Sequence, residues 1–396
     1  MGSYFLQVIA VATMNVRGLP RRLWMSLAMI LASAVVVVIL LAFLAMAKGF
    51  EATMKGAGSD DLAIIIRKGA SAEINSVITR EQLSLLTESP GIARDTKGPD
   101  VSAELYVSVS GTKKDSGSET NIPLRGLGTR GMAMRKNMRL VAGHVFTPGT
   151  NEIMVGEGVL REFNGFEIGQ EVRLGESVWI VVGIFSTGGN VFESEIWADA
   201  KMLQSLYSRG SGYQIVRARL GDSSELIPIE KTIEENSQLN NLDVKIESSF
   251  FIAQSKQLQY IAWFGRIVSY IMAVGALAGA LNTMYTSVSD RAQEIATLRA
   301  LGFNNFSAFF GTLVEAVMLA VVGGLFGSLI AYILFDGMNA STLGGSFTQV
   351  AFSFDMTLDL FIQGVTLALT IGIVSGFFPA WRAARMPVAL AFRRNM

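Results

Sequence analysis

The sequence contains no cysteine and only one histidine, His144, among 396 residues. The absence of cysteine excludes disulfides, thiolate nucleophiles and thiolate metal sites. A single histidine excludes a cluster of histidine ligands, and a lone histidine is most often structural rather than a pH sensor. The formal net charge is +0, so no excess of one sign points to nucleic acid as a partner.

Charge of either sign is also scarce: charged residues make up 17% of the chain and hydrophobic residues 50%. Soluble globular proteins are usually less apolar, so the composition indicates a membrane protein. Four stretches reach the roughly 20 apolar residues that a bilayer-crossing helix needs. They are residues 23–47, 267–288, 306–335 and 360–380, and only Glu315 brings a charge into them. The first is too long for a signal-peptide core, so we expect a retained anchor.

The arginines near the spans predict the orientation, because positively charged short loops stay in the cytoplasm. The segment before the first span (1–22) and the tail after the last (381–396) carry arginine without acid, whereas loop 336–359 carries acid without a base. Both termini are therefore expected in the cytoplasm. The same rule places residues 48–266 and the short loop 336–359 outside it.

The long outer segment, residues 48–266, is large enough to fold around its own core. Period-two alternation and short apolar runs predict strands, and one stretch, 79–86, predicts a helix. The strands are expected at 62–67, 103–110, 152–155, 172–174 and 178–185, with polar loops at 111–120 and 234–241. The predicted fold class is thus an α-helical membrane protein with four transmembrane helices and a mixed α/β extracytoplasmic domain.

Residues 1–22 predict an apolar helix that ends near Gly18 and Pro20 and is too short to span a bilayer. It either lies in the cytoplasmic interface or packs against the bundle, and the sequence favours neither.

Motifs of common catalytic sites are missing from the sequence. There is no G-x-x-x-x-G-K-[ST] phosphate loop, no G-x-S-x-G elbow and no H-E-x-x-H pair. The spans offer almost no ionisable groups for a proton relay. We therefore expect a non-catalytic membrane subunit with no cofactor or metal of its own.

Two features of the spans stand out. Glu315 is a functional candidate because an intramembrane carboxylate is costly, although a hydrogen bond to a neighbouring helix would also explain it. Glycines recur at four-residue spacing, which lets helices approach closely within the bundle and, as a second possibility, between two copies. The pairs are Gly275 with Gly279, Gly323 with Gly327, and Gly372 with Gly376.

The connection at 289–305 predicts a short amphipathic helix on the cytoplasmic surface. Ser287 with Asp290 resembles a capping box, and Gly302 is a suitable helix stop. One edge is apolar, and the charged residues are expected to face solvent or a partner. The edge consists of Ile295, Leu298 and Leu301, and the charged residues are Arg291, Glu294 and Arg299.

Five segments resemble one family of ABC transporter permeases, which includes the macrolide exporter MacB, the division protein FtsX and the lipoprotein-release subunits LolC and LolE. The resemblance covers nearly the whole chain. It is carried by NTMYTSVSDRAQEIATLRALG (282–302), EAVMLAVVGGLFG (315–327), GFFPAWRAARMPVALAFR (376–393), NEIMVGE (151–157) and GQEVRLGESVWIVVG (169–183). The coupling segment departs from the MacB pattern, with Gln293 and Leu298 where arginine is common.

The resemblance implies mechanotransmission in the bacterial inner membrane, as in type VII ABC transporters. Two ATPase subunits that hold ATP and Mg²⁺ would move the spans through the helix at 289–305. Stalk extensions near 48–55 and 250–259 would carry that motion to the outer domain. Implied partners are the ATPase, a second permease copy in a homodimer or heterodimer, membrane lipid and a periplasmic adaptor. Export, lipoprotein release and regulation of a cell-wall hydrolase stay open.

Overall fold

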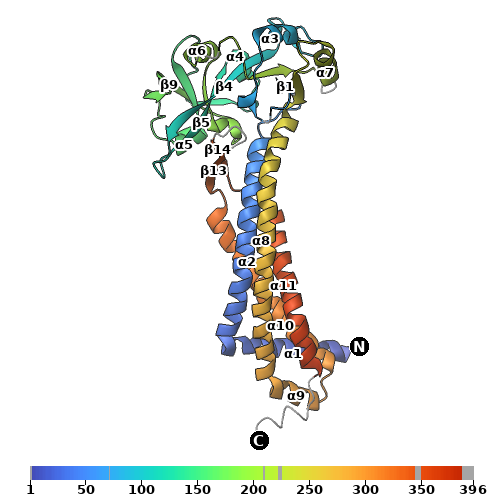
Figure 1. Cartoon of the computed structure of the whole chain (residues 1–396). Coiled ribbons are helices and arrows are strands. Elements are labelled where there is room, and N and C mark those ends of the chain that lie inside the picture. Colours follow the sequence, from blue (N-terminus) through green and yellow to red (C-terminus); the bar gives the residue numbers. More distant parts are fainter. Residues whose placement is uncertain (1, 71, 208–209, 222–224, 344–348, 386–396) are drawn as a thin grey trace. The chain divides into compact units, whose positions relative to one another are not determined.

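The computed structural model describes residues 2–70, 72–207, 210–221, 225–343 and 349–385. The chain forms two compact units (Figure 1). A helical unit comprises Met1–Lys48, Gln259–Met338 and Phe354–Met396, and an outer domain comprises Gly49–Leu258 and Asn339–Ser353. Two long helices, Leu23–Lys55 and Glu247–Asp290, contribute residues to both units.

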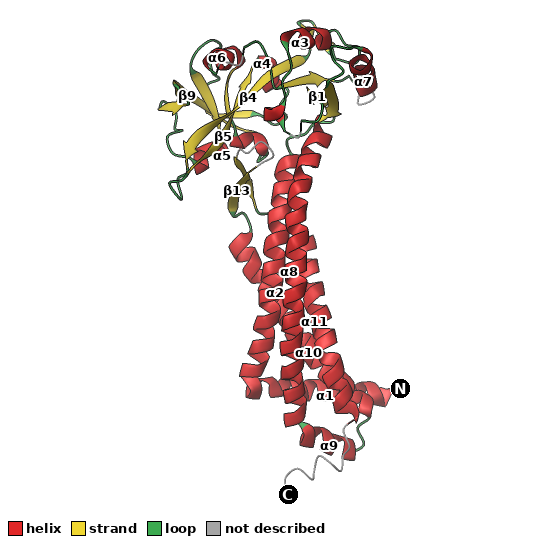
Figure 2. Cartoon of the chain, in the orientation of Figure 1, coloured by secondary structure: helices red, strands yellow, loops and turns green. Residues whose placement is uncertain are grey.

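The helical unit contains long apolar helices together with shorter ones (Figure 2). Four helical stretches are long and apolar enough to cross a membrane: Leu23–Lys55, Ala262–Asp290, Asn305–Phe335 and Leu358–Arg385. They confirm the predicted four spans. The helices are α1 (Gly2–Gly18), η1 (Leu19–Arg22), α2 (Leu23–Lys55), α8 (Glu247–Asp290), α9 (Ala292–Ala300), α10 (Asn305–Phe335) and α11 (Leu358–Arg385).

Glycines set the closest helix contacts of the bundle. A Cβ added at Gly327 would lie 2.5 Å from the carbonyl oxygen of Ala34, so α10 meets the backbone of α2. A Cβ added at Gly376 would lie 2.6 Å from the Cβ of Ala316, where α11 packs on α10. Around Gly275 and Gly279 on α8, by contrast, the described residues leave the space within 4 Å open. Two of the three glycine pairs thus serve packing within the bundle.

Alanine at Gly327 should destabilise the bundle, whereas alanine at Gly275 should not. The added methyl group at Gly327 meets backbone, which cannot give way, and such overpacking costs about 1–3 kcal/mol. At Gly275 the same change gains up to about 1 kcal/mol of helix propensity without a clash within the chain. Thermal unfolding of the two detergent-purified variants checks this, and equal melting temperatures would contradict it.

The outer domain is organised around one mixed sheet. Among the described residues the strand order is β12-β1-β11-β4-β5-β10-β7-β9-β6, with β8 on β9. Its strands are β1 (Leu62–Arg67), β4 (Val101–Thr112), β5 (Glu119–Leu127), β6 (Arg139–Gly143), β7 (Glu152–Gly156), β8 (Glu171–Leu174), β9 (Ser177–Ser186), β10 (Ile196–Asp199), β11 (Ile215–Arg219) and β12 (Leu242–Ile246). Two short hairpins stand apart, β2 (Arg94–Asp95) with β3 (Gly98–Pro99), and β13 (Asn339–Leu343) with β14 (Gln349–Ser353).

Two apolar cores lie on this sheet, one for each half. One core joins strands β1, β11 and β12 to helices α3 and α7, and the other joins β4, β5, β7, β9 and β10 to α5 and α6. The 12-residue strand β4 pairs with β11 in one half and with β5 in the other. The helices are η2 (Glu73–Asn75), α3 (Arg80–Thr87), α4 (Thr129–Ala133), α5 (Glu157–Glu162), η3 (Val191–Ser194), α6 (Ala200–Leu206) and α7 (Leu226–Glu235).

The predicted strands and the predicted helix are confirmed, with shifted ends. The expected loop at 111–120 is shorter, because β4 runs to Thr112 and β5 begins at Glu119. The short loop predicted at 336–359 instead contains the hairpin β13–β14, which packs on the outer domain. There the backbone N–H of Ala351 donates to Ser194 Oγ (2.9 Å), and Phe352 packs edge-on against Phe50.

Candidate functional site

The joint between α8 and α9 is held by a buried ion pair. Arg291 lies between the two helices, and its Nη1 donates to Glu315 Oε2 of α10 at 2.8 Å. Its Nη2 donates to the carbonyl oxygen of Asn15 at 3.3 Å, which adds α1 to the joint. Arg291 is 8% exposed and Glu315 is 3% exposed. One arginine thus connects four helices at this end of the bundle.

The prediction that Arg291 faces solvent or a partner is wrong. Its guanidinium is buried because Glu315, 24 residues further on, supplies the opposite charge that a buried cation requires. The capping box expected from Ser287 and Asp290 is also wrong. Helix α8 continues to Asp290, and the Ser287 hydroxyl accepts a hydrogen bond from Arg22 Nη1 at 3.0 Å instead.

The other residues of the predicted coupling helix divide into inward and outward groups. Ile295, Leu298 and Arg299 are partly buried, and Glu294 is exposed. Helix α9 ends at Ala300, and Leu301 directly after it is 73% exposed. The predicted apolar edge is therefore split, because only Leu301 lies open to a partner.

Gly302 ends the helix as predicted. Its φ is +96°, a region that suits glycine. The N–H of Gly302 bonds to Arg299 O and that of Phe303 to Leu298 O, the pattern of a Schellman motif.

A cavity of about 290 Å³ adjoins the joint. It lies among α1, η1, the end of α8, α9 and the start of α10. Its charged lining residues are Arg17, Arg22, Arg291, Arg299, Glu294 and Glu315. Arginines outnumber glutamates around this space by four to two, so the cavity carries a positive excess.

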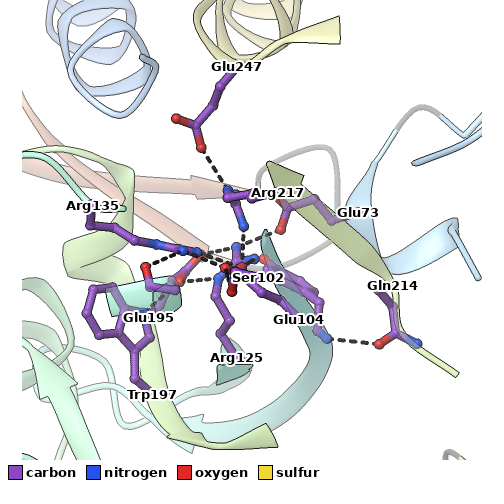
Figure 3. A network of polar contacts seen from close by, with 12 residues as sticks. Glu73, Ser102, Glu104, Arg125, Arg135, Glu195, Trp197, Gln214, Arg217 and Glu247 are labelled. Carbon is purple, nitrogen blue, oxygen red and sulfur yellow. Dashed lines mark hydrogen bonds and ion pairs between the residues drawn. The ribbon is translucent and has the colours of Figure 1, made fainter. Parts of the chain in front are cut away.

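The outer domain holds a second group of buried charges, here named the charged cluster (Figure 3). Each of its side chains is at most 5% exposed. Its members are Glu73, Glu104, Arg125, Arg135, Glu195, Arg217 and Glu247.

Glu104 is the centre of the charged cluster. Its carboxylate accepts from Arg135 Nη1 at 2.5 Å, from Arg125 Nη1 at 3.1 Å and from Arg217 Nη1. Arg125 also donates to Glu195 and Glu73, each at 2.6 Å. Because each arginine serves several carboxylates, the cluster acts as a network rather than as separate pairs.

Burial and neighbouring charge compete in setting the pKa values of this cluster. For Glu104 and Glu73, burial opposes ionisation, but the adjacent arginines outweigh it and hold the pKa below the usual range. For Glu247, burial prevails over Arg217 and raises the pKa. For Arg125, the adjacent Glu195 and Glu73 outweigh burial and raise the pKa. Glu73 and Glu104 are therefore ionised at neutral pH.

Glu247 ties the start of α8 to the charged cluster. It is the first residue of α8, and its Oε1 accepts from Arg217 Nε at 2.7 Å. Its Oε2 accepts from the backbone N–H of Ser59 at 3.1 Å, in the segment that follows α2. The outer end of α8 is thereby fixed to strand β11 and, through Arg217, to β4.

Two family models match the chain. The MacB-like periplasmic core domain matches residues 25–233, more than half of the chain, and the FtsX-like permease C-terminal model matches residues 266–388. This chain belongs to the MacB/FtsX family of ABC transporter permeases. The second match contains the joint, α9 and Glu315, whereas Glu247 lies between the two matches. The outer domain is accordingly an extracytoplasmic domain of a membrane permease.

Several relatives align over much of this permease. A probable export ATP-binding/permease protein of Pseudomonas fluorescens is 25% identical over 74% of this chain and 42% of its own length. MacB 1 of Aeromonas hydrophila, a macrolide export ATP-binding/permease protein, is 26% identical over 74% of this chain and 46% of its own. The uncharacterised permease YknZ of Bacillus subtilis is 24% identical over 69% of this chain and 70% of its own. The permease thus spans less than half of the first two relatives.

Two solved structures are similar to parts of this permease. The periplasmic region of MacB from Actinobacillus actinomycetemcomitans has 12% identity and a TM-score of 0.38, and the match covers 52% of this chain and 95% of that one. The extracellular domain of YknZ from Gram-positive bacteria has 16% identity and a TM-score of 0.36, covering 46% and 99%.

The charged cluster has no clear signature in the sequence. Glu104, Arg125 and Arg217 each stand next to a core residue of the same strand. Neighbouring side chains of a strand point to opposite faces, so a period-two pattern predicts that these three face solvent. They are buried instead, because charged partners of opposite sign surround them. Among the residues that the structure describes, no group of histidine, aspartate and glutamate has the arrangement of a metal site.

Proposed function

We propose that this permease transmits ATP-driven motion of a separate ATPase, which holds ATP and Mg²⁺, to its extracytoplasmic domain and thereby exports a substrate. One observation carries the proposal. Helix α8 is continuous over 44 residues, from Glu247 in the charged cluster to Asp290 beside the α9 joint. At 1.5 Å per residue its length is roughly 65 Å, so one continuous helix would carry a displacement at α9 towards the outer domain.

The contacts around α9 support this role. The Arg291–Glu315 pair fastens the start of α9 to α10, while exposed Glu294 and Leu301 are free to meet another protein. The ATPase would contact this exposed side from the cytoplasm, where both termini would also lie. The names of the relatives favour export, and the working assembly would contain two permease copies, with a periplasmic adaptor as a further partner.

Alanine at Leu301 should weaken the complex with the ATPase. Loss of an exposed apolar anchor from an interface commonly costs about 2 kcal/mol, whereas Arg299→Ala should cost less than about 1 kcal/mol. The double variant Leu298→Ala with Leu301→Ala should weaken the complex at least as much. The measurement is co-purification of the partner ATPase, together with its ATP turnover, which the permease alone should not show.

A matched control is Leu358→Ala, a similarly exposed leucine at the start of α11. It should leave ATPase binding unchanged. Full assembly and full turnover with Leu301→Ala would remove the role assigned to α9.

The orientation can be tested with single cysteines, because the natural chain has none. Ser116 is exposed in the tip between β4 and β5. Asn304, the position expected from the sequence to report the cytoplasm, is partly buried, so its exposed neighbour Asn305 serves better. A membrane-impermeant maleimide should label Ser116→Cys in spheroplasts, but Asn305→Cys only after permeabilisation. Labelling of Asn305→Cys in intact spheroplasts would contradict the predicted topology.

A further inference from the structure

The cavity beside the α9 joint contains more positive charge than the protein neutralises. The charge of Arg291 is balanced by its ion pair with Glu315. Arg22 donates to the carbonyl and hydroxyl oxygens of Ser287, which carry no charge. Among the described residues, Arg17 makes no hydrogen bond or ion pair. Two guanidinium groups at this cavity, those of Arg17 and Arg22, therefore lack a carboxylate within ion-pair distance in the described part of the chain.

The surroundings place this cavity at the level of lipid headgroups. Trp24, two residues after Arg22 and at the start of span α2, is 85% exposed. Trp381, near the end of span α11, is 47% exposed, and the Arg385 guanidinium lies 4.3 Å from its ring centroid. Tryptophan is enriched where membrane-spanning helices meet the headgroup region. This end of the bundle thus lies at a membrane surface.

Helix α1, which lines the cavity, also carries apolar side chains toward the outside. Leu6, Ile9 and Met14 are exposed, as expected for a helix that lies among lipids. Val11, Met14 and Phe303 give the cavity an apolar portion beside its arginines. The volume of about 290 Å³ is many times the roughly 30 Å³ that one water molecule occupies in the liquid. A site with a cationic part, an apolar part and this size suits a lipid headgroup with its glycerol.

We propose that the cavity between α1, α9 and α10 binds the phosphate headgroup of an anionic phospholipid, with Arg17 and Arg22 as its cationic ligands. The proposal goes beyond ATPase coupling and requires only that the bundle spans a membrane. The bound lipid would be part of the joint between α8 and α9, because Ile295 and Leu298 of α9 line the same cavity. Loss of the lipid would leave the packing between α1 and α9 incomplete.

The test is native mass spectrometry of the full chain, purified without the ATPase and titrated with phosphatidylglycerol or phosphatidylcholine. Each arginine near a membrane surface contributes about a five-fold gain in affinity for anionic lipid. Arg17→Gln should therefore weaken phosphatidylglycerol binding about five-fold, and Arg17→Gln with Arg22→Gln roughly thirty-fold. Arg17 makes no contact that the fold needs, so the single variant remains informative if the double variant misfolds.

The matched control is Arg382→Gln with Arg385→Gln, which removes the same charge at the end of α11 but outside the cavity. It should leave phosphatidylglycerol binding unchanged. Equal losses in the cavity and control variants, or none in either, would overturn the proposal. Displacement of the lipid by inorganic phosphate at similar concentration would assign the site to soluble phosphate instead. Displacement by the added ATPase, with loss of ATPase binding in Arg17→Gln, would assign it to the ATPase interface.

Lipid binding is measured before any ATPase is added. The lipid proposal can therefore be disproved while the coupling role of α9 stands, and the coupling role can be disproved while lipid binding stands.

Discussion

Replacing Glu104 by alanine should destabilise the outer domain by about 3–5 kcal/mol. Glu104 accepts hydrogen bonds from Arg125, Arg135 and Arg217, and its side chain is fully buried. Its removal leaves these guanidinium groups short of negative charge in the buried interior of the domain. Among the described residues, Arg135 forms no ion pair with the remaining carboxylates of the cluster, Glu73, Glu195 and Glu247.

The measurement is urea unfolding of the full chain in detergent, followed through the fluorescence of Trp179 and Trp197. Both tryptophans are fully buried in the outer domain and should report its unfolding. The control is Glu235→Ala, which removes an exposed partner of Lys231 and should cost less than about 1 kcal/mol. Equal midpoints for the two variants would mean that the charged cluster does not stabilise the domain.

The cluster should also make the domain sensitive to acid. The pKa values of Glu104 and Glu73 are lowered in the folded state, so their ionised forms stabilise the fold above the unfolded value of about 4.3. That contribution is lost as the pH falls through the lowered folded values. Glu247 acts in the opposite sense, because its raised pKa favours the protonated form in the fold. The free energy of unfolding of Glu104→Ala should therefore fall less steeply than that of the natural chain as the pH is lowered.

Sequence patterns were sufficient to predict the features that depend on residues close together in the chain. Apolar runs of bilayer length predicted the four spans, and period-two alternation predicted strands such as β1 and β9. Both signals depend on which side chains avoid water within a short window. The helix stop at Gly302 followed from the same kind of local reasoning.

Long-range ion pairs could not be predicted in this way. Arg217 and Glu73 are 144 positions apart, and Arg291, which lies between α8 and α9, is 24 positions from Glu315 on α10. Their pairing depends on strand order and helix packing, which hydropathy does not report. The hairpin β13–β14 was missed for a related reason, since its partners Ser194 and Phe50 lie far away in the sequence.

Replacing Arg291 by alanine should have the largest effect in the helical unit. The change leaves Glu315 buried in a span without its partner, which costs about 3–5 kcal/mol, and it frees α9 from α10 and α1. We expect little of this variant in the membrane and no ATP-driven transport. Protein level in isolated membranes and transport by reconstituted vesicles are the measurements.

The variant to compare with Arg291→Ala is the double variant Arg291→Leu with Glu315→Leu, which removes both charges together. Replacing both members of a buried pair by apolar residues is often neutral for stability, so protein level and ATPase binding should recover. Transport should stay low, because two leucines lack the directional hydrogen bonds that fix one orientation of α9 on α10. If the double variant transported as well as the natural permease, the pair would be a packing element only. The motion would then have to pass from α9 to the bundle through the continuous backbone of α8 alone.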